Sequence, residues 1–212
     1  MCADAGACDG PNSSSPPARR VYRGIEVIAR KTLGKELWAQ ASYVYSSLRG
    51  NYDGAINEGS LGTVPGRNTD FDFPALWHNA YGRLFLDRPH RLRLDGYWTS
   101  PWRVSIGLQA FVESGAPESR LLVFQVYQSP LLYQSPRGSV GRMAAQWEAN
   151  LTVGYPIAVR GATLVLQGYV YNLFNNQIPL TRSDDATLGS DYGKFTSRQA
   201  PRSFRAAAKV SF

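Results

Sequence analysis

Hydrophobic and polar residues alternate one by one through much of the chain beyond residue 20. In the last segment, every second side chain from Phe204 to Phe212 is apolar, and Arg205 and Lys209 lie between them. A period of two predicts β-strands whose two faces meet different surroundings. The pattern recurs at 91–98, 104–113, 147–155 and 164–171 and is less regular at 21–33 and 37–50. Together these segments predict about seven strands.

The connections between these segments alternate between short and long. Short links fall at 33–36, 100–102 and 157–162, and long polar links fall near 51–89, 115–143 and 175–201. Loops longer than about 15 residues are uncommon in compact soluble domains. Outer-membrane barrels, by contrast, join their strands by short periplasmic turns and long extracellular loops. The sequence therefore predicts an all-β fold of antiparallel transmembrane strands from the end of a larger outer-membrane β-barrel.

Seven strands are too few and odd in number for a closed bacterial barrel, which uses an even number from 8 upward. An open sheet has two unpaired edges, and unmet backbone groups in lipid cost several kcal/mol each. The missing strands are therefore expected from elsewhere. If Phe212 ends a strand on the periplasmic side, the residues before Val21 lie outside the cell. We expect residues 1–20 to be the disordered remainder of an extracellular loop and 21–212 to be the C-terminal barrel segment.

Composition supports a β-rich chain and argues against several partners. Charged residues make up 18% of the 212 residues, and there are 20 Gly, 12 Tyr and 5 Trp. The net charge of +7 could attract nucleic acid, but the arginines are spread singly along alternating segments, so no nucleic-acid partner is predicted. No apolar run is long enough for a transmembrane helix, and the first residues lack the features of a signal peptide. A membrane protein with this sequence would have to be a barrel.

The sequence contains no recognisable catalytic, cofactor or metal motif. A metal or acid–base site could form in the 51–89 loop, but ordinary turns are the better interpretation. Its candidate residues are Asp70, Asp72, His78, Asp87 and His90. The acidic residues Asp184, Asp185 and Asp191 could bind calcium, although a solvated acidic loop is favoured. Cys2 and Cys8 could form a small disulfide loop or remain two unpaired thiols.

Several segments resemble the last strands of TonB-dependent receptors. These are YRGIEVIARKTL, LWAQASYVYSSLRGNYDG, DRPHRLRLDGYW, YVYNLFNNQ and the terminal strand with its final Phe, and the resemblance extends from Tyr22 to Phe212. It is closest to the Oar-like branch, whose members carry a carboxypeptidase-regulatory-like domain before the plug. The resemblance implies energised ligand uptake through a large plugged barrel. Because this chain has neither plug nor TonB box, it is expected to be a receptor fragment that cannot transport alone and is not an enzyme.

The resemblance also implies roles and partners. Phe204, Val210 and Phe212 would form the signal that the barrel-assembly machinery reads. The expected location is the bacterial outer membrane, and the expected partners are its lipid, the remaining strands and plug of the parent receptor, and the TonB system acting through the missing N-terminal part. Polar residues predicted to face the lumen are Arg91, Arg93, Asp95, Arg205 and Lys209. A passive porin or surface adhesin barrel and a soluble β-sandwich binding module remain the alternatives.

Overall fold

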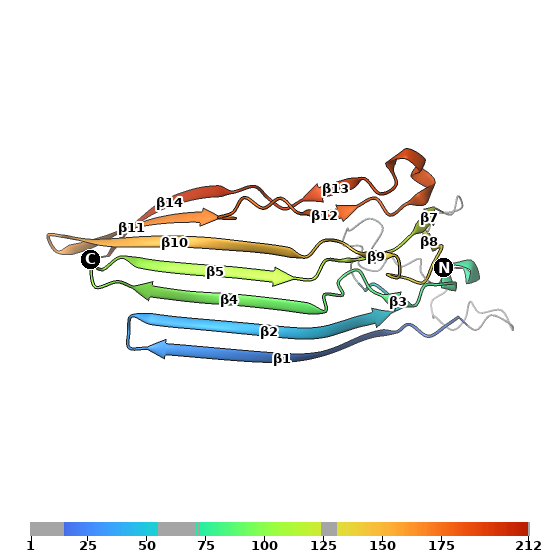
Figure 1. The fold of residues 1–212 in the computed structure, drawn as a ribbon, viewed down its shortest axis with the longest axis horizontal. Helices are drawn as coiled ribbons and strands as arrows, with labels where there is room; N and C mark the ends of the chain where they lie inside the picture. Colours follow the sequence, from blue (N-terminus) through green and yellow to red (C-terminus); the bar gives the residue numbers. More distant parts are fainter. Residues whose placement is uncertain (1–14, 55–70, 72, 124–130, 212) are drawn as a thin grey trace, which may run out of the picture.

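The chain forms one large antiparallel sheet whose strands follow one another in sequence order (Figure 1). The computed structural model describes residues 15–54, 71, 73–123 and 131–211. The seven long strands are β1 (Arg20–Leu33), β2 (Leu37–Gly50), β4 (His90–Thr99), β5 (Ser105–Glu113), β10 (Gln146–Val159), β11 (Ala162–Tyr171) and β14 (Ser203–Ser211). The prediction of an all-β antiparallel fold is thus confirmed. Among the described strands the sheet is open, with β1 and β14 at its edges, and no closed barrel is found.

The predicted alternation of short and long connections is also confirmed. Short turns join β1 to β2, β4 to β5 and β10 to β11 at one end of the sheet, and the described parts of the three long connections lie at the other (Figure 1). Gly34 and Gly161 supply positive φ angles of 59° and 77° in two of the short turns. We call these two sides the turn end and the loop end.

The long connections contain more regular structure than the sequence analysis predicted. They carry the short strands β3 (Gly82–Arg83), β6 (Pro117–Glu118), β7 (Leu121–Val123), β8 (Leu131–Tyr133), β9 (Gly141–Arg142), β12 (Pro179–Arg182) and β13 (Phe195–Arg198), and the 3-10 helices η1 (Pro74–Trp77) and η2 (Ala186–Asp191). β3 extends the main sheet by pairing with the end of β2, whereas the other short strands pair locally. Two- to four-residue pairings leave too little periodicity to be recognised in a sequence.

The less regular segments at 21–33 and 37–50 form the continuous hairpin β1–β2. Its register runs without a break from Arg20 opposite Gly50 to Leu33 opposite Leu37. The alternation was obscured by Ile28, which shares the face of polar neighbours, and by Lys31, which shares the face of apolar ones.

The strand register aligns the apolar positions of all seven strands on one face. One row across the sheet reads Gly96, Leu108, Leu151, Val170 and Phe204. These apolar side chains have little to pack against, since Ile25, Leu108 and Phe204 are 70%, 47% and 73% exposed. We call this the outer face, and the opposite one the inner face.

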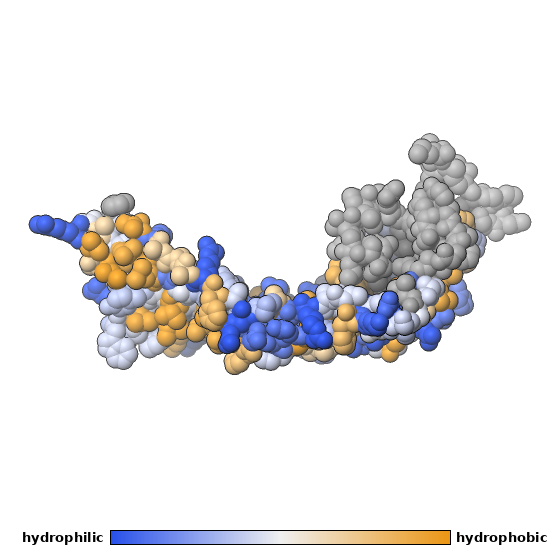
Figure 2. Space-filling model, turned by 90° about the horizontal axis from the view of Figure 1, so that it is seen from above, coloured by the Kyte–Doolittle hydropathy of each residue, from blue (hydrophilic) through white to orange (hydrophobic). Residues whose placement is uncertain are grey.

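Most of the buried apolar core lies at the loop end. Its buried members there are Leu48, Leu76, Ala80, Leu84, Ala116, Leu121 and Met143. The middle of the sheet is a thin layer when viewed from the β14 side (Figure 2). In the described segments, no helix has the length and apolar character needed to cross a membrane.

Candidate functional site

The inner face carries a groove bordered by aromatic side chains. One row across it reads Trp38, Tyr97, Gly107, Thr152 and Tyr169. Trp38 stacks on Tyr97 with ring centroids 6.1 Å apart, and Tyr169 stacks on Tyr171 at 6.2 Å. Gly107 has no side chain, so the floor between the two aromatic pairs is low. The groove is open to solvent.

Polar side chains line the next row of the same groove. Asp95 lies opposite Gln109, which in turn lies opposite Asn150. The Asn150 side chain accepts a hydrogen bond from the Asn172 amide at 2.9 Å, whereas the side chains of Asp95 and Gln109 have no hydrogen-bond partner in the described segments. A groove of this kind can receive a polar segment or solute by hydrogen bonding and ring contact.

The five residues predicted to face inward share the inner face but do not form a cluster. Arg91 lies at the loop end, with its Nε 3.4 Å from a Glu113 carboxylate oxygen. Arg93 is exposed, and the Arg205 guanidinium lies 5.8 Å from the centroid of the Tyr169 ring. Asp95 lies in the groove, and Lys209 lies near the turn end.

Two of the three residues predicted to signal barrel assembly lie on the opposite face. Phe204 and Val210 belong to β14 and are 73% and 51% exposed on the outer face. Phe212 is outside the described residues. An exposed apolar stripe on an edge strand is accessible to another chain.

Asp87 and Arg88, just before β4, have different ionic partners. Asp87 accepts a 2.6 Å hydrogen bond from the Leu48 amide and pairs with Arg142 from β9. Arg88 instead lies with its Nε 3.7 Å from Glu113. Burial lowers the pKa of the Arg88 guanidinium, and the Glu113 carboxylate partly offsets that effect.

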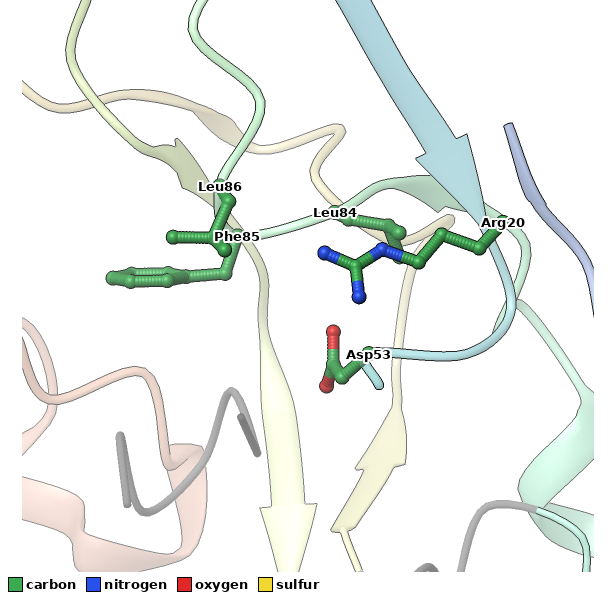
Figure 3. Close-up of a pocket in the computed structure, with 5 residues that line it drawn as sticks. All are labelled: Arg20, Asp53, Leu84, Phe85 and Leu86. Carbon is green, nitrogen blue, oxygen red and sulfur yellow. The ribbon is translucent and has the colours of Figure 1, made fainter. Parts of the chain in front are cut away.

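The first and second long connections are joined through Arg137. It pairs with the Asp53 carboxylate, and its Cζ lies 4.9 Å from the centroid of the Tyr133 ring. Its carbonyl accepts a hydrogen bond from the Arg83 amide at 3.1 Å. The guanidinium of Arg20 also points toward Asp53, next to the apolar side chains that follow β3 (Figure 3).

The second and third long connections are joined through Glu118. Its Oε1 lies 3.0 Å from Arg182 Nε, and Arg182 also contacts Asp184 at 3.3 Å. The Leu121 amide donates to the Asp184 carbonyl at 2.9 Å. Burial raises the pKa of the Asp184 carboxyl, an effect that Arg182 opposes. The described parts of the three connections therefore form a continuous cap over the loop end.

The exit from β11 is held by the two asparagines of the Asn172-Leu173-Phe174-Asn175 motif. Asn172 is 2% exposed and has a φ of 51°, a conformation that asparagine tolerates better than most residues. Its side chain donates to the carbonyls of Asn176 and Ala200 and accepts from the Asn176 amide.

The described residues among the candidate metal ligands do not cluster. In the parts of the chain that the structure describes, no three His, Cys, Asp or Glu side chains are placed to hold a metal ion. His78 follows η1, whereas the His90 ring on the outer face lies 2.7 Å from the Tyr43 hydroxyl. Asp185 caps η2 and Asp191 pairs with Lys194. Asp70, Asp72, Cys2 and Cys8 are outside the described residues.

Sequence reasoning missed the cations that organise the cap. Arg137, Arg142 and Arg182 are surrounded by ordinary polar loop sequence, and each meets a carboxylate that is distant along the chain or in another element. No spacing of residues in the local sequence indicates such ion pairs. The inner-face groove was equally hidden, since it depends on the register between β4, β5, β10 and β11.

Comparison with known proteins gives one informative match. The chain is 29% identical to the TonB-dependent transporter Oar of Myxococcus xanthus over 172 residues, covering 76% of this chain and 16% of that transporter. This similarity supports a distant relationship to the TonB-dependent transporters. No family model matches the chain, and no solved structure matches it. The TonB-dependent resemblance inferred from the sequence is thus confirmed at this level, and the matched relative is a transporter and not an enzyme.

Proposed function

We propose that the chain is part of the barrel wall of a TonB-dependent outer-membrane receptor, with its outer face against lipid and its inner face toward the lumen. The observation that carries the proposal is the register, which gathers exposed apolar side chains from seven strands onto one face. A soluble sandwich would cover such a face with a second sheet. Among the described residues, no second layer covers it.

The dimensions of the outer face support this arrangement. On β10, Trp147 and Tyr155 lie on the outer face near its two ends. They are eight positions apart along the strand, roughly 26 Å at about 3.3 Å per residue. The apolar band of outer-membrane barrels is about 25 Å tall and is bordered by aromatic residues on both sides. Tyr43, Tyr45 and His90 would belong to the border at the loop end.

In this arrangement the loop end faces the outside of the cell and the turn end faces the periplasm. Arg91, Arg93, Asp95, Arg205 and Lys209 would line the lumen, where the groove would meet the plug of the intact receptor. Phe204, Val210 and Phe212 would be read by the barrel-assembly machinery. Energised uptake would require the remaining strands, the plug and the TonB system, so the chain alone would not transport.

Two tryptophans on neighbouring strands provide a matched test of the two faces. Trp98 is exposed on the outer face, and Trp38 lies half-buried on the inner face at nearly the same level. Two variants, each keeping one of these and replacing the other four tryptophans by phenylalanine, would be refolded into vesicles of brominated phosphatidylcholine. We expect strong quenching of Trp98 fluorescence and weak quenching of Trp38.

Equal quenching of both tryptophans, or no association with vesicles, would contradict the proposal. A chain that stays soluble and monomeric without detergent would favour the β-sandwich module. A chain that inserts and conducts ions by itself would favour the passive porin or adhesin alternative.

A further inference from the structure

Three arginines lie on the outer face at the loop end, beyond its aromatic border. Along β2 the outer-face positions read Ala41, Tyr43, Tyr45, Ser47 and Arg49, so apolar, aromatic and cationic side chains follow in that order. Arg23 lies opposite Ser47 on β1, and Arg83 lies opposite Arg49 on β3. We call Arg23, Arg49 and Arg83 the arginine patch.

The pairing of Arg49 with Arg83 is unfavourable without a counter-ion. Like charges directly opposite one another on neighbouring strands destabilise a sheet. Arg23 adds a third charge on the diagonal, where Cα atoms are about 7 to 8 Å apart. None of the three has a carboxylate partner in the described segments, unlike the arginines of the cap. Arg23 and Arg49 are exposed, and Arg83 is half-buried.

The position of the patch limits which anion can reach it. Arg23 is at the level of Ser47, about 7 Å along the strand from Tyr45, and Arg49 is about 13 Å from Tyr45. If Tyr45 marks the edge of the hydrocarbon, these guanidinium groups reach the headgroup layer. Because the side chains share the outer face with Tyr43 and His90, a solute passing through the lumen would not meet them.

We propose that the arginine patch binds the phosphate group of an outer-leaflet lipid headgroup, whose acyl chains lie against Tyr43, Tyr45 and the apolar strand positions below. The planar guanidinium group forms paired hydrogen bonds with phosphate oxygens, and two or three such groups can share one phosphate. The bound phosphate supplies the negative charge that the Arg49–Arg83 pair lacks. This inference rests on the proposed position of the chain in a membrane.

The test compares lipid binding by a variant of the arginine patch with binding by a control variant at the turn end. The full chain would be refolded in zwitterionic detergent micelles and titrated with diphosphoryl lipid A, with thermophoresis reporting the dissociation constant. We expect R49Q/R83Q to bind at least about tenfold more weakly, equivalent to about 1.4 kcal/mol. The matched control K31Q/R160Q removes two exposed charges at the turn end and should bind like the parent chain. Lipid A stripped of its phosphates should bind the parent chain as weakly as diphosphoryl lipid A binds R49Q/R83Q.

Each result has a distinct meaning. Equal binding by R49Q/R83Q and the parent chain, or equal binding of phosphorylated and dephosphorylated lipid, would overturn the proposal. Inorganic phosphate that competes at the same concentration as lipid A would show a general anion site and overturn the lipid assignment. Flotation with vesicles of phosphatidylcholine alone is measured separately. If the chain fails to float, both its proposed position in a membrane and this inference are overturned. If it floats but shows no selectivity for phosphorylated lipid, only this inference is overturned.

Discussion

Arg142→Met is predicted to weaken the cap substantially because it leaves a buried carboxylate without its cation. The Asp87 side chain is 3% exposed, and its two oxygens are held by the Leu48 amide and by Arg142. Removing one partner of a fully buried pair costs about 3–5 kcal/mol, whereas an exposed pair contributes about 0–1 kcal/mol. Arg142 is 24% exposed, so the loss in the free energy of unfolding should be intermediate, about 2–3 kcal/mol.

The measurement is equilibrium urea unfolding of the refolded chain, followed by tryptophan fluorescence. With a slope of about 2 kcal/mol per molar urea, the midpoint should fall by about 1 M. Lys194→Met is the matched control, since Lys194 and Asp191 are 64% and 61% exposed, and its effect should stay below about 0.5 kcal/mol. Equal midpoints for Arg142→Met and Lys194→Met would refute the argument that burial makes the Asp87 pair important.

Three further substitutions test other parts of the loop end. Asn172→Ala removes three side-chain hydrogen bonds at a buried residue of positive φ, so thermal or urea unfolding should show a loss of about 2–4 kcal/mol, and an unchanged midpoint would contradict this role. Gly115→Ala should lower the free energy of unfolding by about 1–3 kcal/mol, because the added Cβ would meet the Met143 carbonyl. An unchanged free energy of unfolding would show that the backbone can move aside. Asp184→Asn concerns pH: because the folded-state pKa is raised, the native chain binds more protons than the unfolded chain between the unfolded and folded pKa values, and stability falls as pH rises through that window. The free energy of unfolding of Asp184→Asn should therefore rise relative to that of the parent chain as pH rises through this window. Urea titrations at several pH values that show a constant difference between the two chains would contradict the pKa shift.

The strands were predictable because each carries its own signal. The alternation from Phe204 to Val210 depends on residues two apart, and the structure repeats it in the register with β11. The hairpin of β1 and β2 was less clear, since Ile28 and Lys31 break the pattern locally while the long register maintains it.

The loop contacts were not predictable, because they join residues far apart in the sequence. Nothing near Arg142 indicates that Asp87 is its partner, as the two lie on different connections. The location of His90 on the outer face was likewise not predictable from the sequence. As one of two histidines in the chain it suggested chemistry, whereas the register puts it opposite Tyr45 on an apolar face, with its ring near those of Tyr43 and Tyr45.

The two edge strands of the open sheet have the same polarity. β1 runs from Arg20 at the loop end to Leu33 at the turn end, and β14 runs likewise from Ser203 to Ser211. Joining β1 directly to β14, within one chain or between two copies, would therefore create a parallel pair in an otherwise antiparallel sheet. An antiparallel ring can include these seven strands only if an odd number of further strands bridges the edges, with the first and last of them running from the turn end to the loop end.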